Sequence, residues 1–167
     1  TTYGTFYVFG NHDYNYYTNK PFYTPDVLRD TLKENGIHVL EDQSYQISKN
    51  FRIVGRKDAS VDRKDIKEVV GDKKKYEFVL LLDHQPKGLK ENKKAGVDLS
   101  LSGHTHAGQI WPTGQLGELI GVTELNYGHR QDGNYQVIVS SGIGGWGYPI
   151  RTGGHSEYVV ITLNTKK

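Results

Sequence analysis

Short apolar runs that stop abruptly at polar residues or glycine recur along the chain. The clearest, residues 78–82, reads Phe-Val-Leu-Leu-Leu and gives way at once to charged and polar positions. Two similar runs, 5–9 and 97–101, lead directly or through one serine into Gly10 and Gly103. Short segments of this kind, bounded by turn-forming residues, are typical of strands buried in a sheet.

The same reasoning predicts six further strands, at residues 37–40, 45–47, 51–54, 124–130, 135–140 and 157–163. The first three follow one another closely enough to form a meander. The two at 124–130 and 135–140 flank the segment Gln-Asp-Gly-Asn, whose composition favours a turn, and they are expected to pair as a hairpin.

Three helices are expected between these strands. The first follows Thr24, a suitable N-cap, has Pro25 in its first turn and ends at Gly36. Residues 56–75 are highly charged but carry apolar residues at helical spacing, which indicates a loop and then a surface helix. Acidic and basic residues alternate there, which favours a solvated face over a nucleic-acid patch. A short third helix is expected at 89–96.

Composition narrows the class of protein. Valine and isoleucine together number 24 and alanine only 3, which favours a β-rich α/β fold of one domain, residues 1–167. The net charge of +2 gives no bulk attraction to nucleic acid. The absence of cysteine excludes disulfides, thiolate metal sites and cysteine nucleophiles. Methionine is absent even at position 1, so we interpret the sequence as a piece of a longer protein.

Histidines follow three of the expected strands. His12 comes after the strand at 5–9, His84 after the one at 78–82, and His104 and His106 after the one at 97–101. In layered α/β folds the loops at strand ends build the active sites. A single histidine is more often structural, but imidazoles delivered from three strand ends favour a metal centre. The amide oxygen of Asn11 would add an uncharged oxygen ligand.

These segments resemble a known family. Gly-Asn-His-Asp at 10–13, Asp-His-Gln-Pro at 83–86 and Ser-Gly-His-Thr-His at 102–106 are similar to the last three motifs of the calcineurin-like metallophosphoesterases, in the same order. The segments 107–112, 141–144 and 149–151 resemble the bacterial YkuE/YaeI-like subgroup. The resemblance implies a four-layer αββα sandwich with mixed β-sheets, of which this chain would supply one sheet and part of the other.

The resemblance also implies a site of two divalent metal ions, Mn, Zn or Fe. Carried over by position, Asn11, His84 and His104 would bind one ion and His106 the other. His12, supported by Asp13, would contact the scissile phosphate and assist the leaving group.

The family's opening motifs, Asp-x-His and Gly-Asp-x-x-Asp/Asn, do not occur ahead of Asn11, so the N-terminal half with the first metal-binding motifs is expected to lie upstream. The parent protein is expected to hydrolyse phosphate mono- or diesters, and this chain to be inactive alone. The alternative is a degenerate, non-catalytic relative that acts as a binding module. The implied partners are a phosphate-ester substrate, the missing N-terminal half and a second copy of the chain. Members of the subgroup are often tethered to the membrane by upstream segments, so the parent protein could be membrane-associated.

Overall fold

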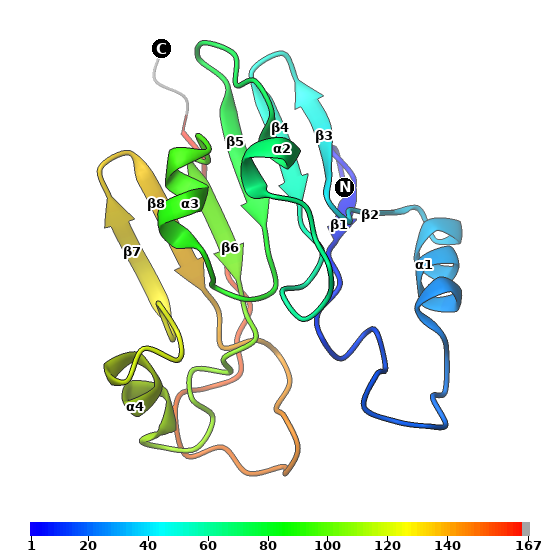
Figure 1. Cartoon of the computed structure of the whole chain (residues 1–167), viewed down its shortest axis with the longest axis vertical. Helices are drawn as coiled ribbons and strands as arrows, with labels where there is room; N and C mark the ends of the chain where they lie inside the picture. Colours follow the sequence, from blue (N-terminus) through cyan, green and yellow to red (C-terminus); the bar gives the residue numbers. More distant parts are fainter. Residues whose placement is uncertain (165–167) are drawn as a thin grey trace.

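The apolar strands form the centre of a mixed six-stranded sheet in the computed structural model, which describes residues 1–164 (Figure 1). Four parallel strands lie side by side, and an antiparallel strand closes each edge. In spatial order the strands are β3 (Gln43–Ser48), β4 (Phe51–Gly55), β5 (Phe78–Leu82), β6 (Leu99–Ser102), β8 (Tyr135–Val139) and β7 (Gly128–Asp132). A separate parallel pair consists of β1 (Thr5–Tyr7) and β2 (Ile37–Val39).

Two short helices, α2 (Ile66–Val70) and α3 (Leu89–Lys94), cover one face of the six-stranded sheet (Figure 1). Alternate residues of β5 and β8 point to this face and form the main core with both helices. The intervening residues, such as Leu80 and Ile138, are only partly buried on the other face. Strand alternation therefore gives the sheet one well-packed face and one incompletely covered face.

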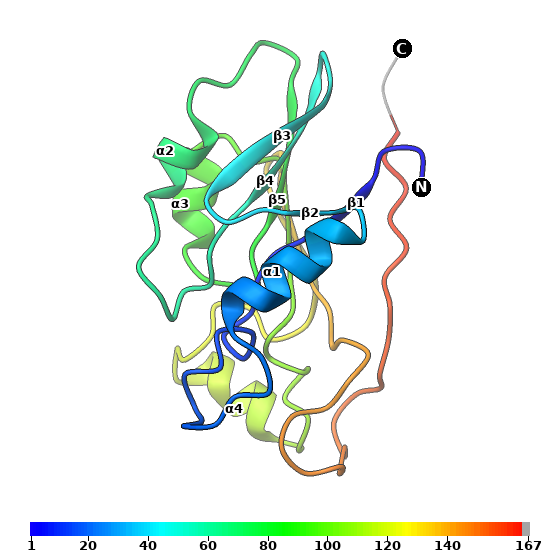
Figure 2. The same ribbon diagram turned by 90° about the vertical axis from the view of Figure 1, so that its right-hand side faces the viewer.

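The first predicted helix is confirmed as α1 (Pro25–Glu34), and the hydroxyl of Thr24 caps it by accepting a bond from the Val27 amide. It packs near β1 and β2 rather than on the large sheet (Figure 2). The hairpin is confirmed as β7 and β8, but it closes through only two residues, 133–134, and its first strand begins at Gly128. A fourth helix, α4 (Thr113–Leu119), was not predicted, since its seven residues include Gly114 and Gly117 and carry a weak helical pattern.

Two strand predictions are wrong. The meander is broken because β2 pairs with β1, and Asp42, at a φ of +53°, turns the chain away before β3 begins. The predicted strand at 157–163 forms no sheet ladder, although it is extended (Figure 2). An apolar alternating segment becomes a strand only where a neighbouring strand offers unpaired backbone groups.

The fold is therefore an α/β arrangement with a mixed six-stranded sheet and few helices, consistent with part of an αββα phosphoesterase fold. None of the helices within residues 1–164 is both long and apolar enough to cross a membrane.

Candidate metal centre

Two neighbouring parallel strands deliver one histidine each to the same place. His84 lies two residues beyond the end of β5, and His104 lies two residues beyond the end of β6. The Gly103 amide donates to the His84 carbonyl, so the two loops remain in register past the sheet. Parallel strands end at the same edge, and this shared edge brings together side chains that are 20 residues apart in sequence.

Asn11 completes a triangle of polar atoms. Its Oδ1 lies 3.0 Å from Nε2 of His84 and 3.1 Å from Nδ1 of His104, and these two nitrogens are 3.1 Å apart. Each neutral imidazole has one N–H, and two inward N–H groups would face each other across the third edge. At least one of the three contacts therefore lacks a good hydrogen bond. By contrast, separations of this size suit atoms that each lie about 2.0–2.2 Å from one metal ion.

Neighbouring residues fix the orientation of this triangle. The amide nitrogen of Asn11 donates to the Tyr17 hydroxyl at 3.1 Å, which turns the amide oxygen toward the imidazoles. The ring of His84 lies directly over the backbone of Gly10, where a Cβ atom would come within 2.8–3.0 Å of three ring atoms. Gly10 is thus required by close approach, which the sequence pattern alone did not reveal.

The two histidines of the triangle are held neutral. Burial, and after it the neighbouring His84, lower the pKa of His104 to about 4. Burial also lowers the pKa of His84. An imidazole must be unprotonated to bind a metal ion, so both rings are in the appropriate state at neutral pH.

The loop that carries His104 has an unusual backbone. Three residues that are not glycine, His104, His106 and Ala107, have φ values of +69°, +52° and +54°. Side chains other than glycine rarely adopt this left-handed region, and such strain is concentrated at functional sites.

His106 lies in the same loop but bonds elsewhere. Its Nδ1 donates to the Gly144 carbonyl at 3.3 Å, which leaves the lone pair on Nε2. Arg151 holds both partners in place, because its guanidinium donates to the carbonyls of His106, at 3.0 Å, and Gly144, at 2.7 Å. The structure does not join His106 to the triangle by a hydrogen bond among residues 1–164.

His12 and Asp13 do not form the expected pair within the described part of the chain. The Asp13 carboxylate accepts bonds from the Tyr7 hydroxyl, at 3.0 Å, and the Gly10 amide, at 2.8 Å. It therefore shapes the turn before Asn11. The exposed imidazole of His12 lies beside the Tyr17 ring, with centroids 5.1 Å apart.

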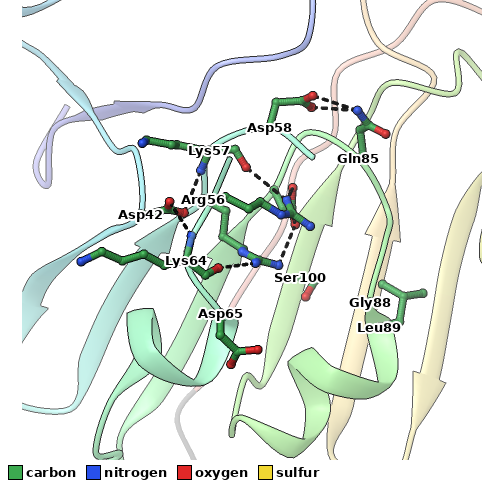
Figure 3. A network of polar contacts seen from close by, with 12 residues as sticks. Asp42, Arg56, Lys57, Asp58, Lys64, Asp65, Gln85, Gly88, Leu89 and Ser100 are labelled. Carbon is green, nitrogen blue, oxygen red and sulfur yellow. Dashed lines mark hydrogen bonds and ion pairs between the residues drawn. The ribbon is translucent and has the colours of Figure 1, made fainter. Parts of the chain in front are cut away.

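A second polar cluster lies beside the triangle, on the helix-covered side of the sheet. Asp83 is 1% exposed and lies 3.0 Å from Arg63 and 3.7 Å from Arg56. Gln85 donates to both oxygens of the buried Asp58 (Figure 3). Burial raises the pKa of Asp83 to about 6, against the opposing effect of the two guanidinium groups. This network anchors the residues on both sides of His84.

The sequence did not predict the supporting contacts of Tyr17, Arg151 and Gln109. Gln109 and Arg151 come from two of the segments that resemble the bacterial subgroup, 107–112 and 149–151, and the structure places these segments in contact. Among residues 1–164 there is no group of three histidine, cysteine, aspartate or glutamate side chains able to hold a metal. The triangle differs from such a group because its third member is an amide.

Three relatives found by comparison with known proteins are uncharacterized metallophosphoesterases. The chain is 35% identical over 174 residues to an uncharacterized metallophosphoesterase of Helicobacter pylori, covering 99% of this chain and 44% of the relative. An uncharacterized metallophosphoesterase of Aquifex aeolicus is 32% identical over 171 residues, covering 98% of this chain and 62% of the relative. The protein YkoQ of Bacillus subtilis, also an uncharacterized metallophosphoesterase, is 32% identical and is covered over 58% of its length.

The chain is therefore homologous, over nearly its whole length, to uncharacterized metallophosphoesterases. It spans about half the length of the curated relatives it matches. No family model matches the sequence. No solved structure matches it either.

Proposed function

We propose that this chain is part of a metal-dependent phosphoesterase in which Asn11, His84 and His104 hold one divalent ion. The observation that carries the proposal is the triangle of three electron-pair donors 3.0–3.1 Å apart, which hydrogen bonds alone leave incompletely satisfied. The relationship to metallophosphoesterases supports the same reading. Activity on phosphate mono- or diesters is proposed for the longer protein.

The donor set suits Mn, Zn or Fe, because two imidazoles and one amide oxygen are intermediate between hard and soft ligands. A divalent ion there would supply positive charge to a phosphoryl oxygen and acidity to a bound water. The chain's own residues supply the positioning. Tyr17 orients the amide of Asn11, Gly10 leaves room for the ring of His84, and burial keeps His104 unprotonated.

We assign His106 to a second ion, through the Nε2 that its bond to Gly144 leaves available. We assign His12 to the phosphate and its leaving group, because its exposed ring stands next to Asn11 in sequence and an imidazole can act as a general acid. Asp13 acts through the backbone of Gly10 rather than through His12.

Titration calorimetry of this chain with Mn and with Zn tests the ion site. We expect one ion per chain, with affinity at least about tenfold weaker in His104→Ala and His84→Ala, since each removes a direct ligand. His129→Ala is the matched control, because that imidazole is exposed and, within residues 1–164, its ring bonds only to Gln136 on the neighbouring strand. Equal binding by all of these variants would contradict the assignment.

The phosphate role is tested by ³¹P relaxation of inorganic phosphate in the presence of the Mn-loaded chain. Bound Mn broadens the phosphate signal only if phosphate approaches the ion. We expect His12→Ala to reduce the broadening while Mn content stays unchanged. Loss of Mn from that variant would mean that His12 is a ligand, and unchanged broadening would remove it from the phosphate site.

A further inference from the structure

One aromatic side chain contacts both parts of the proposed site. The Tyr17 hydroxyl accepts a hydrogen bond from the Asn11 side chain at 3.1 Å. The Tyr17 ring lies beside the imidazole of His12, with a centroid separation of 5.1 Å and a tilt of 41°. Asn11 is the proposed metal ligand and His12 the proposed phosphate contact, so the two ends of one tyrosine lie against groups with different roles.

A tight turn brings Tyr17 back to residues that precede it. The Asn15 amide donates to the His12 carbonyl at 3.1 Å, and Asn15 has a φ of +54°, a left-handed conformation that asparagine adopts more readily than most residues. The Asn15 side chain donates to the Tyr23 carbonyl at 2.9 Å, which fixes this turn within the segment between β1 and α1, the blue loop of Figure 1. Tyr17 therefore reaches the side chain six residues before it.

Two neighbouring tyrosines hold the same segment but point elsewhere. Tyr14 is 6% exposed, packs in the small core with Phe9, and donates its hydroxyl to Glu41 at 3.2 Å. Tyr16 stacks on Tyr14, with centroids 5.6 Å apart and ring planes within 15°. Tyr16 is 70% exposed and Tyr17 65% exposed, so the two differ in what they contact rather than in accessibility.

The imidazole of His12 has little else to orient it. Its ring forms no hydrogen bond to any of residues 1–164, and the side chain is exposed. Asp13, which the sequence predicted as its support, bonds to Tyr7 and Gly10 instead. An exposed side chain without hydrogen bonds samples several rotamers, and an aromatic ring packed beside it favours those that keep the contact.

We propose that Tyr17 is a positioning residue for His12 as well as for Asn11, and that its ring takes the place of Asp13 as the support of the imidazole. The roles of the two partners rest on the proposed function, whereas the contact between Tyr17 and His12 is present without metal. The hydroxyl serves the ligand and the ring serves the phosphate contact. Since a substitution can remove the hydroxyl alone, the two roles can be tested one at a time.

Two substitutions in the whole 167-residue chain separate the roles. Tyr17→Phe deprives the Asn11 amide of its acceptor but keeps the ring. We expect its Mn affinity in calorimetry to fall about tenfold, as loss of a ligand's supporting partner typically causes, while the broadening of the ³¹P signal per bound Mn stays unchanged. Tyr17→Leu removes hydroxyl and ring, so its Mn affinity should fall equally. Its broadening per bound Mn should also fall, by about two- to tenfold, the range that the loss of one aromatic pair implies.

Proton nuclear magnetic resonance of the chelator-treated chain tests the contact with His12 in the absence of metal and phosphate. An aromatic ring shifts the resonances of the protons beside it. The His12 ring resonances, identified by their absence from His12→Ala, should move toward their values in an unfolded chain in Tyr17→Leu and stay in place in Tyr17→Phe. Tyr16→Leu is the matched control, and its His12 resonances, Mn affinity and phosphate broadening should equal those of the parent chain.

Three results would overturn the proposal. These are His12 resonances that do not change in Tyr17→Leu, an unchanged Mn affinity in Tyr17→Phe, and effects of Tyr16→Leu equal to those of Tyr17→Leu. A parent chain that binds Mn while the Tyr17 variants bind it equally well refutes this proposal and leaves the proposed function standing. A parent chain that binds no Mn refutes the proposed function, and the His12 resonances alone then support or overturn the contact with Tyr17.

Discussion

Asp83, His84 and Gln85 are consecutive, yet they belong to two polar clusters of opposite character, one buried and one partly buried. Asp83 and Gln85 belong to the network of Arg56, Arg63 and Asp58, in which opposite charges and complementary donors and acceptors meet. His84 belongs to the triangle, where three atoms that can each accept a hydrogen bond lie close together. The N–H groups available there cannot turn all three contacts into hydrogen bonds.

This difference separates a structural cluster from a ligand site. Past the end of β5 the chain still alternates, so neighbouring side chains are sent in opposite directions. A network of paired groups stabilises the folded chain by itself. A triangle that lacks hydrogen-bond donors is instead stabilised when a ligand such as a metal ion binds to it. The comparison therefore predicts large losses of stability when the network is broken and small ones when the triangle is altered.

The largest effect is expected from Asp83→Asn. This change leaves Arg63 and Arg56 buried without their counter-charge, and breaking a buried pair costs about 3–5 kcal/mol of unfolding free energy. Urea denaturation at pH 7 measures the loss. Asp132→Asn is the control, because its pair with Lys93 is largely exposed and contributes less than about 1 kcal/mol. Equal effects of both variants would show that the network is not a stabilising unit.

The sequence predicted the strands that carry this comparison because their apolar runs are bounded by clear turn signals. Residues 78–82 became β5 with the expected bounds, and the helix after Thr24 formed with its expected cap. The strand prediction for residues 157–163 was wrong because the local sequence pattern does not show whether a partner strand lies nearby. Strand pairing between distant segments, such as β1 with β2, is a property of the whole fold.

The candidate site was predictable only in part, for a similar reason. Histidines at strand ends indicated a metal centre, and the family resemblance assigned Asn11, His84 and His104 to one ion. The structure brings the polar atoms of these three side chains to 3.0–3.1 Å from one another. The directions of Asp13 and His106 could not be read from spacing, because each is set by a contact in three dimensions, with Tyr7 and Gly144 respectively.

A smaller effect is expected from Gly10→Ala. The added Cβ would lie 2.8–3.0 Å from the His84 ring, so the ring must move away from Asn11 and His104. Overpacking of this kind costs about 1–3 kcal/mol, and the displaced ligand should also weaken Mn binding in calorimetry. Gly144→Ala is the control, since its Cβ would meet no atom of residues 1–164 within 4 Å. If Gly10→Ala lost stability but kept its affinity for Mn, the triangle would not be the metal-binding site.

The last expected effect concerns pH, in the metal-free chain with chelator present. The pKa of His104 is lowered by burial to about 4, whereas in the unfolded chain it is about 6.5. The unfolded state therefore takes up the proton first as the pH falls, and the parent chain should lose stability between pH 6.5 and 4 relative to His104→Gln. Asp83 acts in the opposite direction, because its pKa is raised to about 6, but this contribution is common to both chains and cancels in the difference. Unfolding curves at several pH values measure that difference, with His129→Gln as the control. If the difference stayed constant from pH 7 to 4, His104 would have the same pKa in the folded chain as in the unfolded one. The triangle would then not hold its histidines neutral, and the two clusters would not differ in this electrostatic respect.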